Sequence, residues 1–229
     1  MKITKKNSNI VAFIPAKTNS IRLPNKNFKN FNGKPLVYWT ILEAKKSKLF
    51  RSIIVSTDNK KFENICSKLK VDFHNRETKF MKPKSSVLSL CTDFLENEIR
   101  NGNNIDILCI LYATAPLRKS SDIINTYNLI SETCHFSMAV SKYNLPYNQA
   151  LNIKNNRIEC IWKNEIFNNN SKLNNAFVDN GSTYFVNVKS FLREKTFYGK
   201  SLKTYEMPWH KSIDINNHYD FKLVKKLFK

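Results

Sequence analysis

Glycine is scarce in this chain: there are 4 among 229 residues, and none belongs to a GxGxxG or GxxxxGK[ST] motif. This excludes the two commonest glycine-rich phosphate-binding loops. Long apolar runs are also missing, since the longest, 107–113, has seven residues, whereas a membrane span needs about 20. The apolar stretch 10–14 is likewise too short for a signal-peptide core. We therefore expect a cytoplasmic protein without a membrane partner.

Cysteine and histidine show no arrangement that indicates a site. The 5 cysteines are far apart and form no CxxC motif, and the 4 histidines lack metal-ligand spacing. No histidine accompanies a serine or cysteine nucleophile motif. Reduced, mostly buried thiols are the expected state, as is usual in the cytosol.

Acidic residues are few, with 18 Asp and Glu against 38 Lys and Arg, which gives a formal net charge of +20. Such a charge invites a nucleic-acid partner. However, the 31 lysines accompany 31 asparagines and 21 isoleucines, all types with AT-rich codons, and no lysine cluster is long enough for a basic arm. We predict small polyanionic molecules as partners, and no nucleic acid.

Short apolar strands alternate with helical patterns along most of the chain. Strands are predicted at 10–14, 53–55, 71–73, 106–111, 136–140 and 182–188, and helices at 35–44, 62–69, 87–94, 123–130 and 221–228. Ser56, Thr57 and Asp58 are expected to cap the second helix. This β-α order predicts an α/β protein with a doubly wound, mostly parallel sheet.

The alternation breaks between residues 143 and 175, where the chain is rich in asparagine and the segment 158–162 alternates like a β-hairpin. We interpret 143–175 as a small inserted arm. The α/β domain then comprises 1–142 and 176–229.

Three cations gather in the loop after the first predicted strand, namely Lys17, Arg22 and Lys26. Ligands of open parallel sheets bind at the carboxyl ends of the strands. Cations there suit a polyphosphate, because they neutralise charge while backbone N–H groups donate. An ordinary solvated basic loop is the alternative.

Two further segments carry polar groups beyond predicted strands. Tyr112, Thr114 and Arg118 surround a turn at Pro116, which suits a polar acidic substrate. Asp214 lies near the end of the chain, and a carboxylate there can hold Mg²⁺. A surface Arg118 and a helix-capping Asp214 are the alternatives.

Six short segments occur in a characteristic order along nearly the whole chain. They read IPA…PNKN, GKPLV, VSTD, LYATAPLR, NGSTY and SIDIN, and begin at Ile14, Gly33, Val55, Leu111, Asn180 and Ser212. In this order they resemble the acylneuraminate cytidylyltransferase family, the CMP-sialic acid synthetases, together with their pseudaminic and legionaminic acid relatives. The resemblance implies a Rossmann-like nucleotidyltransferase fold.

The resemblance also implies a reaction for cell-surface glycan synthesis. The anomeric hydroxyl of an acidic nine-carbon sugar attacks the α-phosphate of CTP, CMP is transferred and pyrophosphate leaves. By motif match, Lys17, Lys26 and Asp214 are the implied catalytic residues, and Asp214 is the implied Mg²⁺ ligand. The implied nucleotide-binding residues are Ala16, Lys17, Ser20, Arg22, Lys26, Asn27 and Lys82, and the implied sugar-binding residues are Tyr112, Thr114, Arg118, Asn180, Gly181 and Tyr184. The arm 143–175 occupies the place of the family's dimerisation arm, which implies a homodimer.

This chain departs from the family pattern at several phosphate and metal positions. Lys17 replaces an arginine, so that a bidentate fork becomes a point charge, and Ile21 replaces a basic residue. Asn216 replaces the second carboxylate of the SxDID motif. Two alternatives to an active cytidylyltransferase for nine-carbon sugars therefore stay open: a nucleotide- or sugar-binding homologue with little turnover, and a deoxyoctulosonate cytidylyltransferase, which the triplet Arg22-Leu23-Pro24 suggests.

Overall fold

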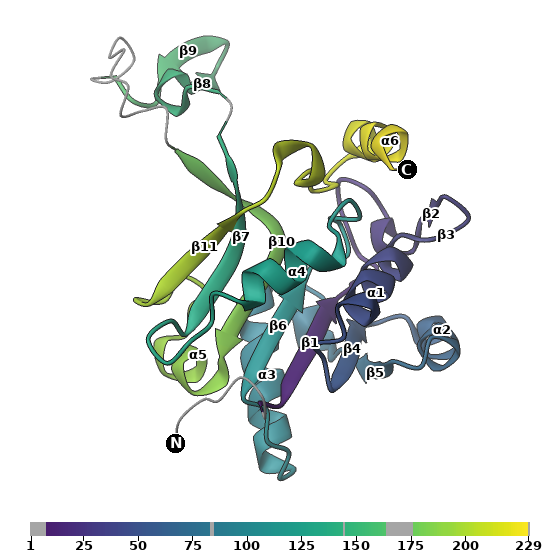
Figure 1. Ribbon diagram of the computed structural model, residues 1–229. Helices are drawn as coiled ribbons and strands as arrows, with labels where there is room; N and C mark the ends of the chain where they lie inside the picture. The colour runs from purple at the N-terminus through teal and green to yellow at the C-terminus, as the bar shows by residue number, and fades with distance from the viewer. Residues whose placement is uncertain (1–7, 83–84, 144, 164–175, 229) are drawn as a thin grey trace.

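The computed structural model describes residues 8–82, 85–143, 145–163 and 176–228. Its centre is a seven-stranded sheet with the strand order β11-β7-β10-β6-β1-β4-β5 (Figure 1). Only β10 in this sheet runs against its neighbours β6 and β7, and the other pairs are parallel. The predicted α/β fold with a mostly parallel sheet is confirmed. The strands are β1 (Ile10–Pro15), β4 (Ser52–Thr57), β5 (Asp72–Asn75), β6 (Ile107–Leu111), β7 (Phe136–Lys142), β10 (Phe177–Asn187) and β11 (Leu202–Glu206).

Helices cover both faces of the sheet because the inner strands are apolar on both sides. In β1, Ile10, Ala12 and Ile14 pack into one core with α1, α2 and α4, whereas Val11 and Phe13 pack into a second core with α3 and α5. No helix within the described ranges is long and apolar enough to cross a membrane. The helices are α1 (Leu36–Ser47), α2 (Glu63–Lys68), α3 (Val87–Arg100), α4 (Ser120–Tyr127), α5 (Val188–Glu194) and α6 (His218–Leu227).

The connections of the sheet define where a ligand can enter. From β1 the chain continues through β4 and β5 on one side, then returns to β6 on the other side of β1. The winding therefore reverses between β1 and β6, and a crevice opens beyond their carboxyl ends. The loops at 16–33 and 112–119 follow directly from these two ends.

Some local predictions were wrong. Asn59, and not the segment 56–58, caps the turn before α2, because its side chain accepts from the backbone N–H of Lys61, while the Asp58 carboxylate accepts from the backbone N–H of Thr18 at 2.8 Å. Helix α4 ends at Tyr127 instead of Ile130, because the chain continues in turns. Helix α5 and strand β11 were not predicted.

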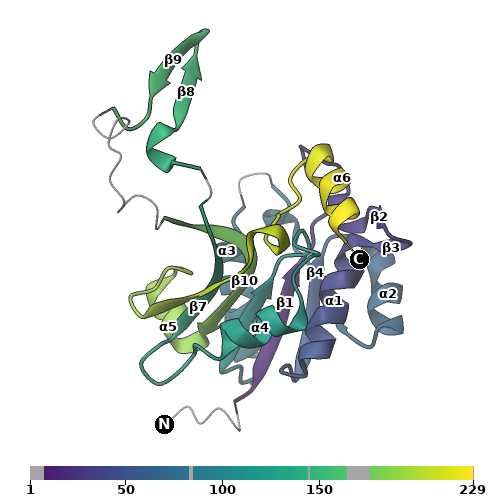
Figure 2. The same cartoon turned by 45° about the horizontal axis from the view of Figure 1, so that its top comes forward.

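The segment predicted as an arm includes a separate two-stranded sheet, β8 (Leu151–Lys154) and β9 (Arg157–Cys160). This hairpin projects away from the central sheet beyond β7 and β10 (Figures 1 and 2). Residues 144 and 164–175 of the predicted arm lie outside the described residues.

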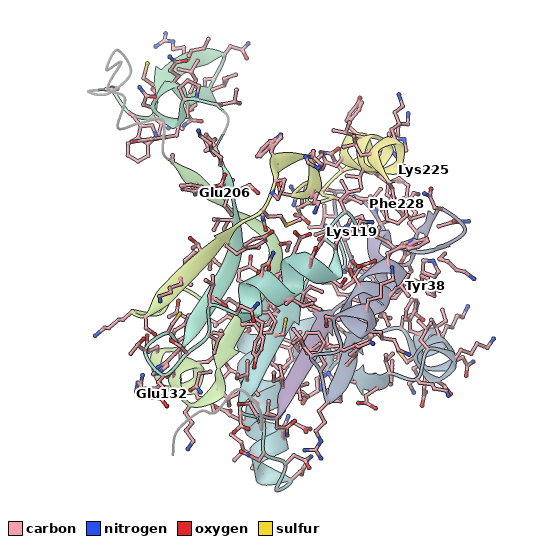
Figure 3. All side chains as sticks on the ribbon, in the orientation of Figure 1. Tyr38, Lys119, Glu132, Glu206, Lys225 and Phe228 are labelled. Atoms are coloured by element: carbon pink, nitrogen blue, oxygen red, sulfur yellow. The ribbon has the colours of Figure 1, made fainter. Side chains whose placement is uncertain are left out.

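Helix α6 lies over the loop between β1 and α1. Phe221 and Val224 of α6 form a third buried cluster with Leu23, Phe31 and Leu36, and the short strands β2 (Asn30–Phe31) and β3 (Lys34–Pro35) belong to the same loop. At the end of α6, the Phe228 ring meets Lys119, whose Nζ lies 5.3 Å from the ring centroid (Figure 3). This packing brings the segment before α6, which contains Asp214, against the first loop.

Candidate active site

A cavity of ≈ 240 Å³ opens at the switch point of the sheet. Its walls come from the loops after β1, β5 and β6, from the start of α3, and from the segment before α6. The lining groups are cationic (Lys17, Lys26, Arg76), amide or hydroxyl (Asn27, Ser85, Ser86, Tyr112, Thr114, Asn216), acidic (Asp214) and apolar (Pro15, Phe80, Val87, Leu90, Ala113).

The first loop presents Lys17 and Lys26 because polar side chains hold it against the sheet. Asn25 adopts a left-handed conformation, with φ 53°, directly before the 3₁₀ helix Lys26–Phe28. The buried amide of Asn27 donates to the Lys17 carbonyl at 2.8 Å. Thr18 is fixed by Asp58. Asp58 thus holds this part of the first loop in place.

Lys26 connects the first loop to the far end of the chain. Its Nζ donates to the carbonyl oxygen of Ile215 at 2.8 Å. Burial lowers the pKa of the Lys26 ammonium more strongly than the nearby Asp214 carboxylate raises it, and the cations Arg22 and Lys17 lower it further. A cation held in this way is poorly neutralised by the protein alone and is suited to an anionic ligand.

Asp214 shares the cavity with Lys26, and its carboxyl group interacts with the side chains of Asn216 and Thr114. Its Oδ2 accepts from Nδ2 of Asn216 at 2.7 Å, and its Oδ1 is buried without a hydrogen-bond partner among the described residues. Burial raises the pKa of this carboxyl. Asn216 in turn accepts from Nη2 of Arg22 at 2.7 Å.

The unpaired Asp214 oxygen fits a divalent cation. Mg²⁺ prefers oxygen ligands and is commonly held by one or two carboxylates plus substrate phosphates. The part of the chain that the structure describes has no cluster of three or more His, Cys, Asp or Glu side chains that could hold a metal. A cation at Asp214 would therefore take most of its ligands from phosphates and water.

A second cavity, of ≈ 320 Å³, meets the first at Asp214 and Asn216, which line both. Its other walls are Val178, Asp179, Asn180, Gly181, Trp209, Ser212 and Ile213. Gly181 has φ +63° in an irregular part of β10, and a Cβ atom there would lie 3.8 Å from Cγ of Asp214. Two compartments therefore share one carboxylate.

The sequence-predicted site residues separate into three groups. Lys17, Lys26, Asn27, Tyr112, Thr114 and Asp214 line the first cavity, and Asn180, Gly181 and Asp214 line the second. Ala16 is buried at the end of β1, and Tyr184 is buried next to the second cavity and bonded to Asp179. Ser20, Arg22 and Lys82 are exposed or half-buried and line neither cavity, although Arg22 reaches Asn216.

Arg118, assigned by resemblance to the sugar site, lines neither cavity. Its side chain is 1% exposed. The guanidinium donates to the Ser182 carbonyl at 2.6 Å, to the Tyr112 carbonyl at 3.3 Å and to Oγ1 of Thr40 at 2.9 Å. Burial lowers its pKa to about 10. Because these donors point into the core and join α1, β10 and the loop after β6, Arg118 positions the Tyr112 loop, and its assignment to the sugar site stays a prediction.

Two residue groups that line the first cavity were not predicted from the sequence. Arg76 follows β5 and is 6% exposed, and its Nη2 donates to the Ser56 carbonyl at 3.1 Å. Ser85 and Ser86 lead into α3, where Ser86 is the helix cap. The strand-end rule applied after the short strand at 71–73 would have found Arg76, but neither group belongs to a motif that the sequence analysis recognised.

A larger cavity, of ≈ 620 Å³, lies at the other end of the sheet. Asn9, Arg51, Ser52 and Ile105 place it at the amino ends of β1, β4 and β6. It contains none of the predicted site residues. Ligands of open parallel sheets bind at the carboxyl ends, so the smaller pair of cavities is the candidate active site.

The sequence model of the cytidylyltransferase family matches residues 11–225. The chain belongs to the cytidylyltransferase family. It is therefore a CTP-dependent nucleotidyltransferase, and the predicted family relationship is confirmed.

Two bacterial enzymes are similar to this chain over nearly its whole length. This cytidylyltransferase is 26% identical over 231 residues to the pseudaminic acid cytidylyltransferase of Campylobacter jejuni, with 96% of each chain covered. It is 28% identical over 226 residues to the CMP-N,N'-diacetyllegionaminic acid synthase of Legionella pneumophila, again with 96% of each chain covered.

A solved structure shares the fold. The structure of CMP:2-keto-3-deoxy-manno-octonic acid synthetase complexed with CTP superimposes with a TM-score of 0.67 at 14% identity. The match covers 96% of this chain and 98% of the other. At this identity the likeness supports the fold of this cytidylyltransferase and nothing finer.

Proposed function

We propose that this cytidylyltransferase transfers CMP from CTP to the anomeric hydroxyl of a nonulosonic, sialic-like acid and releases pyrophosphate. The observation that carries the proposal is the shared wall of the two cavities. Asp214 and Asn216 lie between a compartment that contains Lys17 and Lys26 and a compartment lined by β10. Such a junction suits the point where a nucleotide and an acceptor meet.

The first cavity is assigned to CTP. Lys17 and Lys26 face the space where the triphosphate would lie, and their charges offset those of the phosphates. Phe80, Val87 and Leu90 form an apolar wall, and Arg76, Ser85 and Ser86 place polar groups beside it. This combination of an apolar surface with a few polar groups suits a nucleobase.

The second cavity is assigned to the sugar. In the proposed reaction, the anomeric oxygen forms a bond to the α-phosphorus of CTP, the bond from that phosphorus to the bridging oxygen of pyrophosphate breaks, and the hydroxyl proton is released. Little covalent chemistry is required of the protein, so positioning and charge stabilisation dominate. Lys26 stabilises the negative charge on the transferring group, and its bond to Ile215 keeps it beside Asp214.

A magnesium ion is part of the proposal. Asp214 would hold it through the unpaired Oδ1, and Thr114 and Asn216 line the same cavity. When bound, Mg²⁺ neutralises phosphate charge.

Release of pyrophosphate tests the function directly. The purified chain is incubated with CTP, Mg²⁺ and, separately, N-acetylneuraminic, N,N'-diacetyllegionaminic and pseudaminic acids. We expect release that requires all three components, and a large loss in Lys26→Ala and Asp214→Ala. Binding of CTP without release for any acid would instead identify a nucleotide-binding homologue without turnover.

An eight-carbon acceptor is the second candidate. The superposition on a solved synthetase for an octonic acid shows that the fold accommodates such enzymes. Adding 2-keto-3-deoxy-manno-octonic acid to the same panel separates the two. A higher kcat/KM for this sugar than for every nine-carbon acid would favour the second candidate.

We also propose that the β8–β9 hairpin binds a second copy of this chain. Leu151, Ile153 and Ile158 are 50%, 71% and 67% exposed on a two-stranded sheet that projects from the main body. An isolated hairpin of this kind is marginally stable in water, and a second hairpin from another copy would cover its apolar side chains. Light scattering should give a dimer for the native chain and a monomer for Ile153→Glu with Ile158→Glu. A monomeric native chain at micromolar concentration would contradict the proposal.

A further inference from the structure

Asp179 of β10 forms an unusual polar cluster at the second cavity. Its Oδ1 accepts from the backbone N–H of Gly181 at 2.9 Å and from the Tyr184 hydroxyl at 2.7 Å. Its Oδ2 accepts from the Tyr198 hydroxyl at 2.5 Å. The cluster exists because the register of β10 against β7 shifts between Asp179 and Tyr184. The shift brings Tyr184 to the carboxylate, and Tyr198 reaches it from the segment after α5.

This carboxylate has capacity for a further donor. An ionised carboxylate offers about four acceptor positions, and the contacts above occupy three. No lysine or arginine among the residues that the structure describes forms an ion pair with Asp179. The charge without an ion-pair partner and the free lone pair of Oδ2 both favour a further hydrogen-bond donor from a ligand.

The surroundings of Asp179 suit the less polar part of a sugar. Trp209 lines the same cavity, is 50% exposed, and offers an aromatic face.

Burial raises the pKa of the Tyr198 phenol to about 12 and also raises that of Tyr184. Both hydroxyls therefore stay protonated at neutral pH and continue to donate to Asp179. The carboxylate is thus fixed in place before a ligand arrives.

The position of the reacting hydroxyl sets the direction in which an acidic sugar lies. Lys26 and Lys17 lie on the CTP side of the junction, whereas Asp179 lies on the sugar side. In a nonulosonic acid the carboxylate is attached to the anomeric carbon, so the reacting end is also the acidic end. That end carries the hydroxyl that must reach the α-phosphate at the junction, so the far end, which carries hydroxyl and N-acyl groups, is left next to Asp179 and Trp209.

We propose that Asp179 is a specificity-determining residue that accepts a hydrogen bond from a hydroxyl or amide N–H group at the end of the sugar distant from its carboxylate. The inference rests on the proposed function, because it takes the second cavity to be the sugar site. Tyr184 and Tyr198 are positioning residues that hold the carboxylate. Trp209 packs against the N-acyl or ring surface of the same end.

The competing explanation is that Asp179 only holds the irregular part of β10 together and does not contact the sugar. The variant Asp179→Asn separates these two explanations. An asparagine can keep Oδ1 on Gly181 and Tyr184, so the bulge retains its bonds. Its Nδ2 then replaces Oδ2: the Tyr198 hydroxyl, which can also accept, turns to accept from one N–H, and the other N–H faces the donor of the sugar. Asp106→Asn is the matched control, since Asp106 also accepts from a backbone N–H, that of Asn9 at 2.8 Å, but at the amino ends of the strands.

The test measures steady-state kinetics with CTP, Mg²⁺ and the sugar that the native enzyme uses best. For Asp179→Asn we expect the KM for the sugar to rise about tenfold to hundredfold, the range for a hydrogen bond to a charged group. The KM for CTP, the kcat and the melting temperature should remain close to native, as all parameters should in Asp106→Asn. An unchanged sugar KM, or equal changes in both KM values together with a lower melting temperature, would overturn the inference.

The outcome is distinguishable from a failure of the proposed function. If the native enzyme uses no sugar in the panel, the proposed function fails before Asp179 is considered. If Asp179→Asn does not fold, saturation-transfer NMR on the native enzyme with CTP and N-acetylneuraminic acid decides. Stronger saturation of the C7–C9 and N-acetyl protons than of the C3 protons supports the orientation, and the reverse contradicts it.

Discussion

Lys26 donates a hydrogen bond from Nζ to the carbonyl oxygen of Ile215, which lies 189 residues later in the chain, at 2.8 Å. Ile215 also donates its backbone N–H to the Thr114 carbonyl at 2.8 Å. Through these two bonds, the segment with Asp214 is attached both to the loop after β1 and to the loop after β6. The cationic and acidic halves of the site therefore form one cleft.

Replacing Lys26 should remove charge stabilisation without removing the fold. In Lys26→Ala we expect kcat/KM for CTP to fall about 100-fold to 1000-fold, as for the loss of one well-placed group that stabilises charge in the transition state. Lys68→Ala is the matched control, since Lys68 is exposed on α2. If both variants retained the native kcat/KM at an unchanged melting temperature, Lys26 would not act on the phosphates.

The pH profile of kcat/KM for CTP should be bell-shaped. Burial raises the pKa of Asp214, so the carboxylate becomes protonated, and activity falls, at a higher pH than for an ordinary aspartate as the solution is acidified. Burial lowers the pKa of Lys26, so its positive charge is lost, and activity falls, at a lower pH than for an ordinary lysine as the solution is made alkaline. The profile of kcat/KM reports groups in the free enzyme.

Lys26→Arg tests the alkaline side of this profile. A guanidinium remains protonated beyond the range of lysine, so the alkaline limb should move to higher pH while the acidic limb stays in place. An alkaline limb at the same pH in both proteins would assign it to another group.

Asn216→Asp should increase the dependence of the protein on Mg²⁺. The Asn216 amide donates to Oδ2 of Asp214, and an aspartate would replace that bond by repulsion between two carboxylates. Without Mg²⁺ we expect the melting temperature to fall. With Mg²⁺ we expect it to recover, because two carboxylates bind the ion more tightly than one. The measurement is thermal unfolding against Mg²⁺ concentration, and an equal response in native and variant protein would contradict a metal at Asp214.

The regular elements could be predicted because their signals are local. The strand at 106–111 is apolar on both faces, and β6 is buried along its whole length. The positions Val87, Leu90, Cys91 and Phe94 follow one helical face, and α3 buries the last three of these. Helix α5 is short, and β11 is an edge strand with exposed polar residues. Neither carries enough apolar periodicity to be recognised.

The site could be predicted only in part, because several of its contacts are long-range. Lys17, Lys26 and Asp214 belong to recognisable motifs, and the structure brings them to one cavity. Asp179 gains significance only when a bulge brings Tyr184 to it and the chain returns with Tyr198. The burial of Arg118 could not be predicted, because an arginine beside a proline turn resembles a surface residue or a ligand-binding residue, whereas its acceptors lie on α1, on β10 and in the loop after β6.

Replacing Arg118 should affect stability more than sugar binding. In Arg118→Met the carbonyls of Ser182 and Tyr112 and the Thr40 hydroxyl lose their donor inside the core. We expect the free energy of unfolding to fall by about 2–4 kcal/mol, since buried polar groups left without partners cost about 1–3 kcal/mol each and part of that is recovered by relaxation. Urea denaturation gives this value, and Arg193→Met is the surface control, because Arg193 bonds Glu194 on the exposed side of α5. Below the unfolding transition, the KM for the sugar should change less than in Asp179→Asn. A large rise in that KM at native stability would instead return Arg118 to the sugar site, with its guanidinium turned out of the core.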